Sequence, residues 1–520
     1  MKTVARTVAG NTLANVTRLA VTSLVSIFLP AYLTHQLPVK TYGAWVLILQ
    51  LSAYVNYLDF GVQTAVSKYI AEYRAKQDER GCSACASAGF AIVVVAGILG
   101  VLLTLVLVWR VPVIFRTMPV SFFPDVRRAV LFVGLSLSVS LATSVFVAIF
   151  LGLQRYRIPM MTTIANRLAF GVVICAAATA HASLATMGAL AASVNILTAG
   201  LQVAMWRKHA SHISMSVNLI DVALLKKMLR YCSVLVIWSL SAMLISGLDL
   251  TVVGHYSFSE TAYYAIANAP VAFLVLIVSA LMGPLLPAAS AQSVASSPAE
   301  MGQFLAVSTR LSVAGLLLTG LPFMVVGHLI LRAWVGPVYT LHSTPFLHIL
   351  ILANIIRSSC APFSTMVLAT GQQKVATASP VAEGIINLVA SVWLVQHLGA
   401  LGVALGTLIG ACAGVAVHFA VSMRFTRSRI GIAPAELFLA GMLRPASIAL
   451  PSIPFLWSGM PTSIFVYCAW GAATLLVAWF AALNREERER LNRTVGRRWQ
   501  QFQDGHGDLV ATALAGESGE

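Results

Sequence analysis

The chain has 520 residues, of which 58% are hydrophobic and only 10% are charged, and its formal net charge is +16. A soluble protein holds roughly 25% charged residues because its surface faces water, so this composition excludes a soluble globular protein. Apolar segments of about 20 residues, the length that crosses ~30 Å of hydrocarbon, recur along the chain. We therefore expect an integral membrane protein.

Apolar segments predict the membrane helices in chain order. Residues 86–109, 129–154, 311–331 and 445–484 contain no Asp, Glu, Lys or Arg. Runs of this length without strict alternation favour helices over a transmembrane barrel. The predicted fold is all-α, with about 14 transmembrane helices near residues 11–35, 42–63, 86–110, 129–153, 160–182, 185–206, 228–254, 262–289, 305–328, 344–370, 374–397, 399–423, 436–457 and 462–483.

The positive charge is distributed unevenly between the predicted loops. Most of the 34 lysines and arginines fall in the tails and in the loops on the side of the N-terminus. Cytoplasmic loops carry an excess of Lys and Arg, so both termini are predicted to be cytoplasmic. Because the charge reports orientation, we expect no nucleic-acid partner.

Two stretches about 220 residues apart resemble each other. Residues 152–155 (GLQR) follow predicted helix 4, and residues 371–374 (GQQK) follow predicted helix 10. A six-helix spacing predicts two lobes of the same orientation, which is typical of secondary transporters with a substrate site between the lobes; chance similarity of Gly- and Ala-rich segments is the alternative. The predicted domains are an N-lobe (1–206), a linker (207–227), a C-lobe (228–425), helices 13 and 14 (426–483) and a cytoplasmic tail (484–520).

Charged residues inside the predicted helices are the candidates for function. A charge at the bilayer centre costs at least ~2.5–3.5 kcal/mol, so these side chains are expected to face a water-filled cavity or one another. Three arginines favour an anionic substrate because a guanidinium binds phosphate oxygens in a bidentate manner; internal pairing with acids is the alternative. The set comprises Arg18, Arg167, Arg357, Asp59, Asp249 and Glu383.

Polar residues on the first helix form one face. Asn11, Asn15, Arg18 and Thr22 lie at i, i+4, i+7 and i+11, which predicts a cavity lining; a sealed contact between helices is the alternative. Asn166 precedes Arg167, and Asn387 lies four residues after Glu383, so polar groups recur in both lobes. The predicted substrate-binding residues are Arg18, Arg167, Arg357, Asn11, Asn15, Thr22, Asn166 and Asn387.

The acidic residues are predicted to couple transport to protons or sodium ions, because burial in a medium of low dielectric favours uptake of a cation. Asp249 is the first candidate and Glu383 the second. Asp59 is the third, with simple solvation near the cytoplasmic end of helix 2 as the alternative. We predict no catalytic residue, no cofactor and no metal site, since Cys82 and Cys85 lack the further ligands that a metal site needs.

Several motifs together resemble a known family. They are residues 42–45 (YGAW), 58–61 (LDFG), 247–249 (GLD) with Gly254, 334–337 (WVGP) and 399–407 (GALGVALGT). In this order, across roughly residues 10–425, they resemble the lipid-linked polysaccharide-unit flippases of the Wzx type, in the multidrug/oligosaccharidyl-lipid/polysaccharide exporter superfamily. The chain departs from the family pattern at residues 257–264, where a Gly-rich approach to a single Tyr is absent.

The resemblance implies transport of an undecaprenyl-diphosphate-linked oligosaccharide from the cytoplasmic to the periplasmic leaflet of a bacterial inner membrane, for exopolysaccharide, O-antigen or capsule synthesis. It implies membrane lipids, a polysaccharide polymerase and a chain-length regulator as partners. Alternatives are a multidrug or peptidoglycan-precursor transporter of the same superfamily, and a membrane glycan polymerase or glycosyltransferase. Because no DxD or ExD pair is present, we expect a transporter rather than an enzyme.

Overall fold

The computed structural model describes residues 2–489 apart from 284, 373–374, 376 and 458–462; the side chains of residues 2–16, 234, 280, 281, 294, 456 and 457 are outside that description. All regular secondary structure in the described residues is helical. Fourteen segments among them are long and apolar enough to cross a membrane. The predicted all-α fold with fourteen spans is confirmed.

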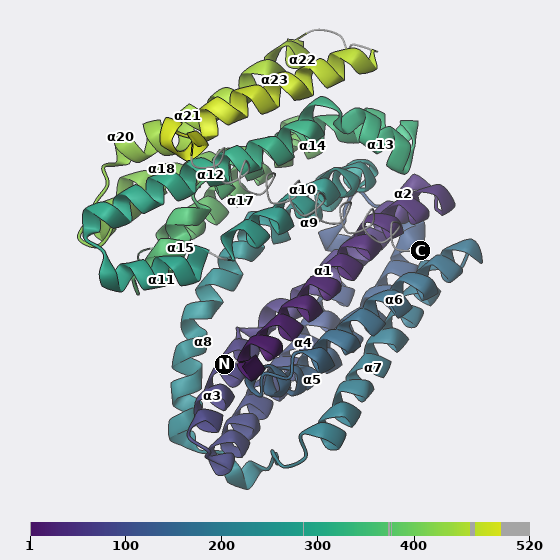
Figure 1. Ribbon diagram of the computed structural model, residues 1–520. Helices are drawn as coiled ribbons and strands as arrows, with labels where there is room; N and C mark the ends of the chain where they lie inside the picture. The colour runs from purple at the N-terminus through teal and green to yellow at the C-terminus, as the bar shows by residue number, and fades with distance from the viewer. Residues whose placement is uncertain (1, 284, 373–374, 376, 458–462, 490–520) are drawn as a thin grey trace, which may run out of the picture.

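The first six spans form the N-lobe (Figure 1). Span 2 is continuous but irregular, because the 3-10 segment η1 separates its two α-helical parts. The elements are α1 (Lys2–Gln36), α2 (Val39–Ala53), η1 (Tyr54–Asp59), α3 (Val62–Ala75), α4 (Glu79–Ile114), η2 (Val120–Phe122), α5 (Phe123–Gly152), α6 (Arg157–Thr179) and α7 (Leu184–His209).

The next spans form the C-lobe, with two further spans packed on it. The C-lobe elements are η3 (Val217–Leu219), α8 (Val222–Ala242), η4 (Met243–Gly247), α9 (Asp249–Tyr256), η5 (Phe258–Glu260), α10 (Thr261–Met282), α11 (Leu285–Ala295), α12 (Pro298–Val325), α13 (Gly327–Val335), α14 (Pro337–Ser358), α15 (Ala361–Ala369), α17 (Ala378–Leu398), α18 (Ala400–Val417), η6 (His418–Ser422) and α19 (Met423–Thr426). The last two spans comprise α20 (Pro434–Glu436), η7 (Leu437–Leu443), α21 (Arg444–Ala446), η8 (Ser447–Ser452), α22 (Ile453–Trp457) and α23 (Ile464–Ala482).

Span 2 is longer than predicted. The sequence suggested an end near residue 63, but the span runs from Val39 to Ala75. Phe60 and Gly61 adopt left-handed φ angles of 48° and 75°, a conformation that commonly ends a helix. Here α3 begins directly afterwards, so the pair bends the span without ending it. Asp59 therefore lies at the bend between the two helical parts of the span.

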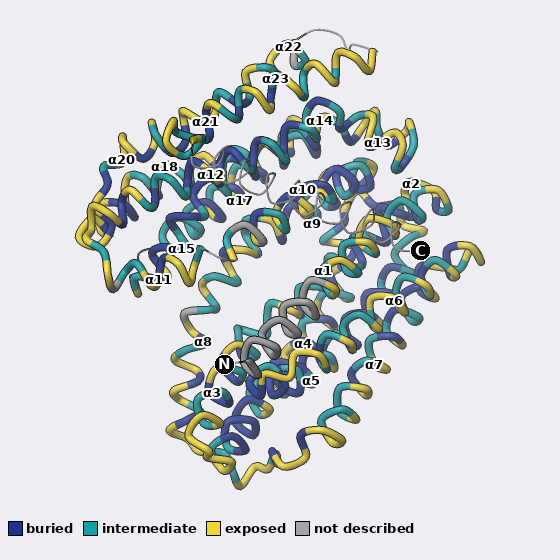
Figure 2. The backbone as a smooth tube through the Cα atoms, viewed as in Figure 1, coloured by how far each residue is buried: buried dark blue, intermediate teal, exposed yellow. Residues whose placement is uncertain are grey.

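The outward surface of the helices is apolar. Val95 and Val106 of α4 are 57% and 53% exposed, and Phe465 of α23 is 80% exposed. Figure 2 shows that buried residues concentrate between the helices of each lobe, whereas exposed residues lie on the outside. Large exposed apolar surfaces are rare on soluble monomers and are the normal lipid-facing surface of membrane helices. The chain is a multi-pass membrane protein.

The two lobes meet at one side of the membrane. Hydrogen bonds between them join the helix halves nearest the loops that the charge distribution predicts to be outer. The Trp334 indole donates to the Ile27 carbonyl at 2.8 Å, and His255 Nδ1 lies 2.6 Å from the Ile114 carbonyl oxygen. Figure 1 shows the lobes converging near α2, α9 and α10, with α8 running between them at the other side. We call this contact the outer seam.

Helix α8 packs on both lobes in turn. Its first half contributes Leu224, Met228 and Cys232 to a buried cluster with α3, α4 and α5 of the N-lobe. After α8, Leu244 lies against Gly384 of α17, where an added Cβ would be 2.7 Å from the Leu244 Cβ atom. The span therefore links the lobes directly. The predicted domain boundary at residue 228 remains a prediction.

An ion pair between a buried arginine and a partly exposed glutamate joins the final helices to the C-lobe. Arg310 of α12 donates through Nη2 to both carboxylate oxygens of Glu487, at 2.6 and 2.7 Å. The Arg310 side chain is 6% exposed. Arg444 donates to the carbonyls of Phe480 and Leu483 at the end of α23, each at 3.2 Å. These contacts fix the start of the tail to α12.

Arg310→Ala is expected to destabilise the protein by about 1.5–3 kcal/mol, because it removes a charge-assisted hydrogen bond made by a buried arginine. Arg485→Ala is the matched control, since the Arg485–Glu489 pair at 3.3 Å is largely exposed and such pairs contribute little. Thermal unfolding in detergent measures both variants. Equal melting temperatures for Arg310→Ala and wild type would show that the ion pair carries no stability.

Candidate functional site

A buried polar cluster in the C-lobe surrounds Asp249, the first residue of α9. The side chain is 8% exposed. Its Oδ2 atom lies 3.1 Å from the Thr407 hydroxyl and 3.5 Å from the Tyr264 hydroxyl, both of which donate to it. Its Oδ1 atom accepts from the Asn387 amide at 3.3 Å. Residues of α9, α10, α17 and α18 thus converge on one carboxylate.

The π-helical segment η4 supplies further oxygens to this cluster. A π segment shifts the backbone hydrogen-bonding pattern and is frequent at functional sites. The Asn387 amide nitrogen lies 3.2 Å from the Leu244 carbonyl oxygen and 2.7 Å from that of Ile245. Ser391 donates to the Asn387 Oδ1 atom at 3.0 Å, which fixes the orientation of the amide. Asn387 is fully buried.

These oxygens suit a small hard cation or a proton. Hard cations take carboxylate, hydroxyl and carbonyl oxygens, and transporters build sodium sites from irregular backbone near mid-membrane. Asp249, Thr407 and the Leu244 and Ile245 carbonyls form such a set, with the Asn387 amide donating into it. No group of three or more His, Cys, Asp and Glu side chains suited to a metal ion occurs in the described part of the chain.

Arg357 and Glu383 form an ion pair in the same lobe. The Arg357 Nε atom donates to Glu383 Oε1, with the carboxylate side chain 7% exposed and the arginine 21% exposed. A Cβ atom at Gly414 would lie 2.8 Å from Glu383 Oε2, so glycine there allows α18 to approach the carboxylate. Arg357 also acts electrostatically on Asp249. Arg357 is thus paired internally in this structure, which favours the alternative to substrate binding.

The polar face of α1 is described from Thr17 onward. Arg18 and Thr22 are both half-buried, and the Thr22 hydroxyl donates to the Arg18 carbonyl at 2.7 Å. Arg18 lies about 27 Å from the C-terminal end of α1 at Gln36, at 1.5 Å per residue. The side chains of Asn11 and Asn15 lie outside the described residues.

Asn166 and Arg167 are neighbours on α6 with different surroundings. The Asn166 amide donates to Thr198 Oγ1 at 2.9 Å, so it joins α6 to α7 inside the N-lobe. Arg167 is exposed, and no hydrogen bond or ion pair to it is found among the described residues. It lies about 18 Å from the end of α6 at Thr179. An unpaired guanidinium at that depth requires water or an anion rather than lipid.

Asp59 occupies the bend of span 2. It is half-buried and interacts with the backbone N–H groups of Gly61 and Gln63. A carboxylate at a helix N-terminus stabilises unpaired N–H groups, here those of α3. This position suits a structural role in the bend, and a part for Asp59 in ion coupling stays a prediction.

Several residues of the Asp249 cluster were not assigned from the sequence. Thr407 closes the 399–407 motif, and Ser391 lies one turn after Asn387, so both had a local signal. The η4 carbonyls had no sequence signal, because a π segment leaves no pattern in the sequence. Tyr264 had no signal that it would contact Asp249, because this contact arises from the packing of α10. Their roles depend on how four helices pack together.

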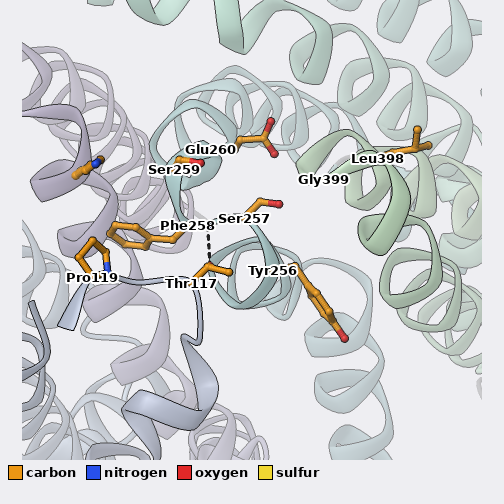
Figure 3. Close-up of a pocket in the computed structure, with 10 residues that line it drawn as sticks. Thr117, Pro119, Tyr256, Ser257, Phe258, Ser259, Glu260, Leu398 and Gly399 are labelled. Carbon is orange, nitrogen blue, oxygen red and sulfur yellow. Dashed lines mark hydrogen bonds between the residues drawn. The ribbon is translucent and has the colours of Figure 1, made fainter.

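An outer cavity lies at the seam between the lobes (Figure 3). It has a volume of about 550 Å³ and is lined from the N-lobe by Lys40, Thr117 and Pro119, and from the C-lobe by residues 256–260 and 398–399. The Phe258 amide donates to Thr117 Oγ1 at 3.1 Å across the seam. This hydrogen bond helps to close the lobes on the predicted outer side.

The fold, the apolar exterior and the buried polar groups define a membrane transporter with two lobes. Residues 8–293, more than half of the chain, match the family model described as polysaccharide biosynthesis protein. The chain belongs to this polysaccharide biosynthesis protein family. No curated protein sequence matches it.

Solved structures show the same fold at low sequence identity. The lipid II flippase MurJ in an inward closed conformation is similar with a TM-score of 0.65 and 12% identity, over 91% of this chain and 96% of that chain. An inward-facing multidrug resistance MATE family transporter of the MOP superfamily has a TM-score of 0.61 and 14% identity, over 80% of this chain and 98% of its own. A MOP superfamily transporter from Pyrococcus furiosus has a TM-score of 0.54 and 14% identity, covering 82% and 95%. The chain has the fold of these transporters.

Proposed function

We propose that the protein is a flippase that moves an undecaprenyl-diphosphate-linked oligosaccharide from the cytoplasmic to the periplasmic leaflet for polysaccharide synthesis. The observation that carries this proposal is the match of residues 8–293 to a polysaccharide biosynthesis family, in a chain with a two-lobed transporter fold. A chain of this fold contributes to such a pathway by carrying its lipid-linked intermediate. An enzyme of the pathway would need catalytic groups that the described polar clusters do not resemble.

Arginine side chains on two adjacent helices support an anionic substrate. Arg18 of α1 and Arg167 of α6 lie in the N-lobe, and Gly171, one turn after Arg167, faces Val25 of α1. Two guanidinium groups on adjacent helices fit a diphosphate, which offers several acceptor oxygens. We assign diphosphate binding to them, with Thr22, Asn11 and Asn15 along the same face of α1. Arg357 forms an ion pair with Glu383, so we do not include it in the proposed diphosphate site.

We assign the coupling of transport to a proton or sodium ion to Asp249. Glu383 holds Arg357 nearby. We place the protein in a bacterial inner membrane with both termini cytoplasmic, as the loop charges predict. A polysaccharide polymerase and a chain-length regulator would consume the product on the outer side. The substrate and protons or sodium ions complete the list of proposed partners.

Transport in proteoliposomes tests the function. Purified protein is reconstituted with an undecaprenyl-diphosphate-linked oligosaccharide, and an impermeant glycan-oxidising reagent reports how fast inner-leaflet substrate reaches the outside. The expected result is faster labelling than in protein-free vesicles. Labelling at the protein-free rate contradicts the proposal, and retention of the effect with a glycan on a neutral lipid would argue against diphosphate recognition.

A peptidoglycan-precursor flippase is the second candidate, favoured by the fold likeness to MurJ over 91% of this chain. That likeness is at 12% identity and concerns the fold alone. The same assay with a lipid-linked muropeptide distinguishes the two candidate functions. Faster labelling of the muropeptide than of the oligosaccharide would favour the second candidate.

A further inference from the structure

Two irregular helix segments meet in the middle of the protein. Span 2 passes from α2 into the 3-10 segment η1 and then bends at Phe60 and Gly61. Span 7 contains the π segment η4, which ends at Gly247. Breaks of this kind in otherwise regular helices mark hinges and functional positions. One break belongs to the N-lobe, and the other leads into the C-lobe.

The contact between the two segments converges on one carbonyl group. The Gln50 amide donates to the Gly247 carbonyl at 2.6 Å, and the Tyr54 hydroxyl donates to the same oxygen at 3.0 Å. The Tyr54 hydroxyl also lies 2.5 Å from Thr251 Oγ1. Because a hydroxyl has one proton, the consistent arrangement has Thr251 donating to Tyr54 and Tyr54 donating to Gly247. Two N-lobe side chains thus use both lone pairs of this carbonyl.

The segments are packed without spare room. A Cβ atom at Gly247 would lie 2.7 Å from the Tyr57 hydroxyl, so a side chain at this position would separate the two spans. Gly247 is buried. The hydrogen bonds from Gln50 and Tyr54 therefore depend on how η4 sits against span 2.

The same segment also forms one wall of the Asp249 cluster. The Leu244 and Ile245 carbonyls accept from Asn387 of the C-lobe, while the Gly247 carbonyl is held by the N-lobe. A cation attracted to Asp249 would compete with the Asn387 amide for the two carbonyl oxygens. Binding at Asp249 would then shift the segment that Gln50 and Tyr54 hold.

We propose that Gln50 and Tyr54 are positioning residues that couple occupancy of the Asp249 site to opening of the outer seam. The inference rests on the proposed role of Asp249 as the coupling site. Without a cation, the two donors hold η4 against span 2 and the seam stays closed. A bound cation draws the Leu244 and Ile245 carbonyls toward the C-lobe, weakens the contact with Gly247 and allows the lobes to part.

Distance measurements across the seam test this coupling. Spin labels are attached to Lys40→Cys and Leu398→Cys, which replace residues that line the outer cavity from opposite lobes. The exposed Cys412 and Cys468 and the half-exposed Cys175 are first replaced by serine. Distances are recorded in lipid nanodiscs with sodium, with choline in its place, and at two pH values.

Tyr54→Phe and Gln50→Leu are each expected to raise the open-to-closed ratio without cation by about fivefold, the effect of one lost hydrogen bond. The cation-dependent change in this ratio should shrink by a similar factor. Tyr57→Phe is the matched control, because it removes a hydroxyl from the same segment without removing a hydrogen bond found among the described residues. A purely structural role would lower the melting temperature and leave the cation response unchanged.

The outcomes separate this inference from the proposed function. If Tyr54→Phe and Gln50→Leu respond to cations as wild type does, while Asp249→Asn does not, the role of Asp249 stands and the inference is overturned. If Asp249→Asn also responds as wild type does, the proposed coupling site is wrong. If the distances in the wild-type protein change with neither sodium nor pH, the inference about Gln50 and Tyr54 and the coupling role of Asp249 are both overturned.

Discussion

Arg18→Ala is expected to reduce polysaccharide export by about tenfold or more, because a hydrogen bond to a charged group contributes about 1.5–3 kcal/mol. Arg18 lies on the polar face of α1, and Arg167 lies on the adjacent helix α6, four residues before Gly171, which faces Val25 of α1. Its loss would remove one of the two guanidinium groups that we assign to the diphosphate. Polymer at the surface of cells that lack their own flippase measures export, with protein abundance measured in the same membranes.

Arg18→Lys should restore part of the export, because lysine keeps the charge but loses the bidentate geometry. Arg110→Ala is the matched control: Arg110 stacks on Trp109 with its guanidinium 4.2 Å from the ring centre, near the predicted outer end of α4. Normal export by Arg18→Ala would show that the stripe on α1 is a structural contact between helices. Reduced export by both variants would point to a general loss of folding.

The sequence was sufficient to predict the membrane spans because hydrocarbon imposes a length and a composition on every spanning helix. The largest difference, in span 2, has a local cause. Gly61 has a left-handed φ angle of 75°, which usually ends a helix, and Lys68 and Arg74 follow as they would in a loop. Only the structure shows α3 continuing to Ala75.

The candidate site was predictable only in part. Asp249 and Asn387 were selected because polar residues are costly in a membrane, and the structure places them 3.3 Å apart. Both are buried, but the periodicity of the sequence could not show that these residues, which lie on two different helices, contact each other. Tyr264 and the η4 carbonyls join the site through packing and a π segment, neither of which leaves a pattern in the sequence.

Arg357 illustrates why charge alone does not assign a role. The three arginines were equivalent in sequence terms, since each is a single basic residue inside an apolar span. The structure distinguishes them by their surroundings: Arg357 is held by Glu383, whereas Arg167 is exposed and has no hydrogen bond or ion pair among the described residues. A buried pair of this kind fixes geometry more than it binds ligands, so Arg357 is better understood as a fixed positive charge near Asp249.

Asp249→Asn is expected to leave the protein folded and able to bind substrate, but to abolish accumulation driven by an imposed pH or sodium gradient. Asparagine keeps the size of the side chain and can still pair with Thr407 and Tyr264, so the loss should be of cation binding and not of packing. A carboxylate that meets both sides of the membrane in turn can carry a cation if its affinity differs between the two conformations. A membrane potential of 100 mV supplies ~2.3 kcal/mol per charge moved, which biases the cycle by roughly fifty-fold.

Accumulation of lipid-linked substrate in proteoliposomes measures this effect, with the gradient collapsed by an ionophore as the reference condition. Thr407→Val is an informative companion variant, because it removes one donor to Asp249 Oδ2 while keeping the shape of the side chain and the carboxylate itself. We expect an altered cation affinity and retained coupling in that variant. If Asp249→Asn follows the gradient as wild type does, Asp249 does not couple transport. If wild type ignores both gradients, the protein is a facilitator whose direction is set by removal of the product, and Asp249 is then a structural carboxylate held by Thr407, Tyr264 and Asn387.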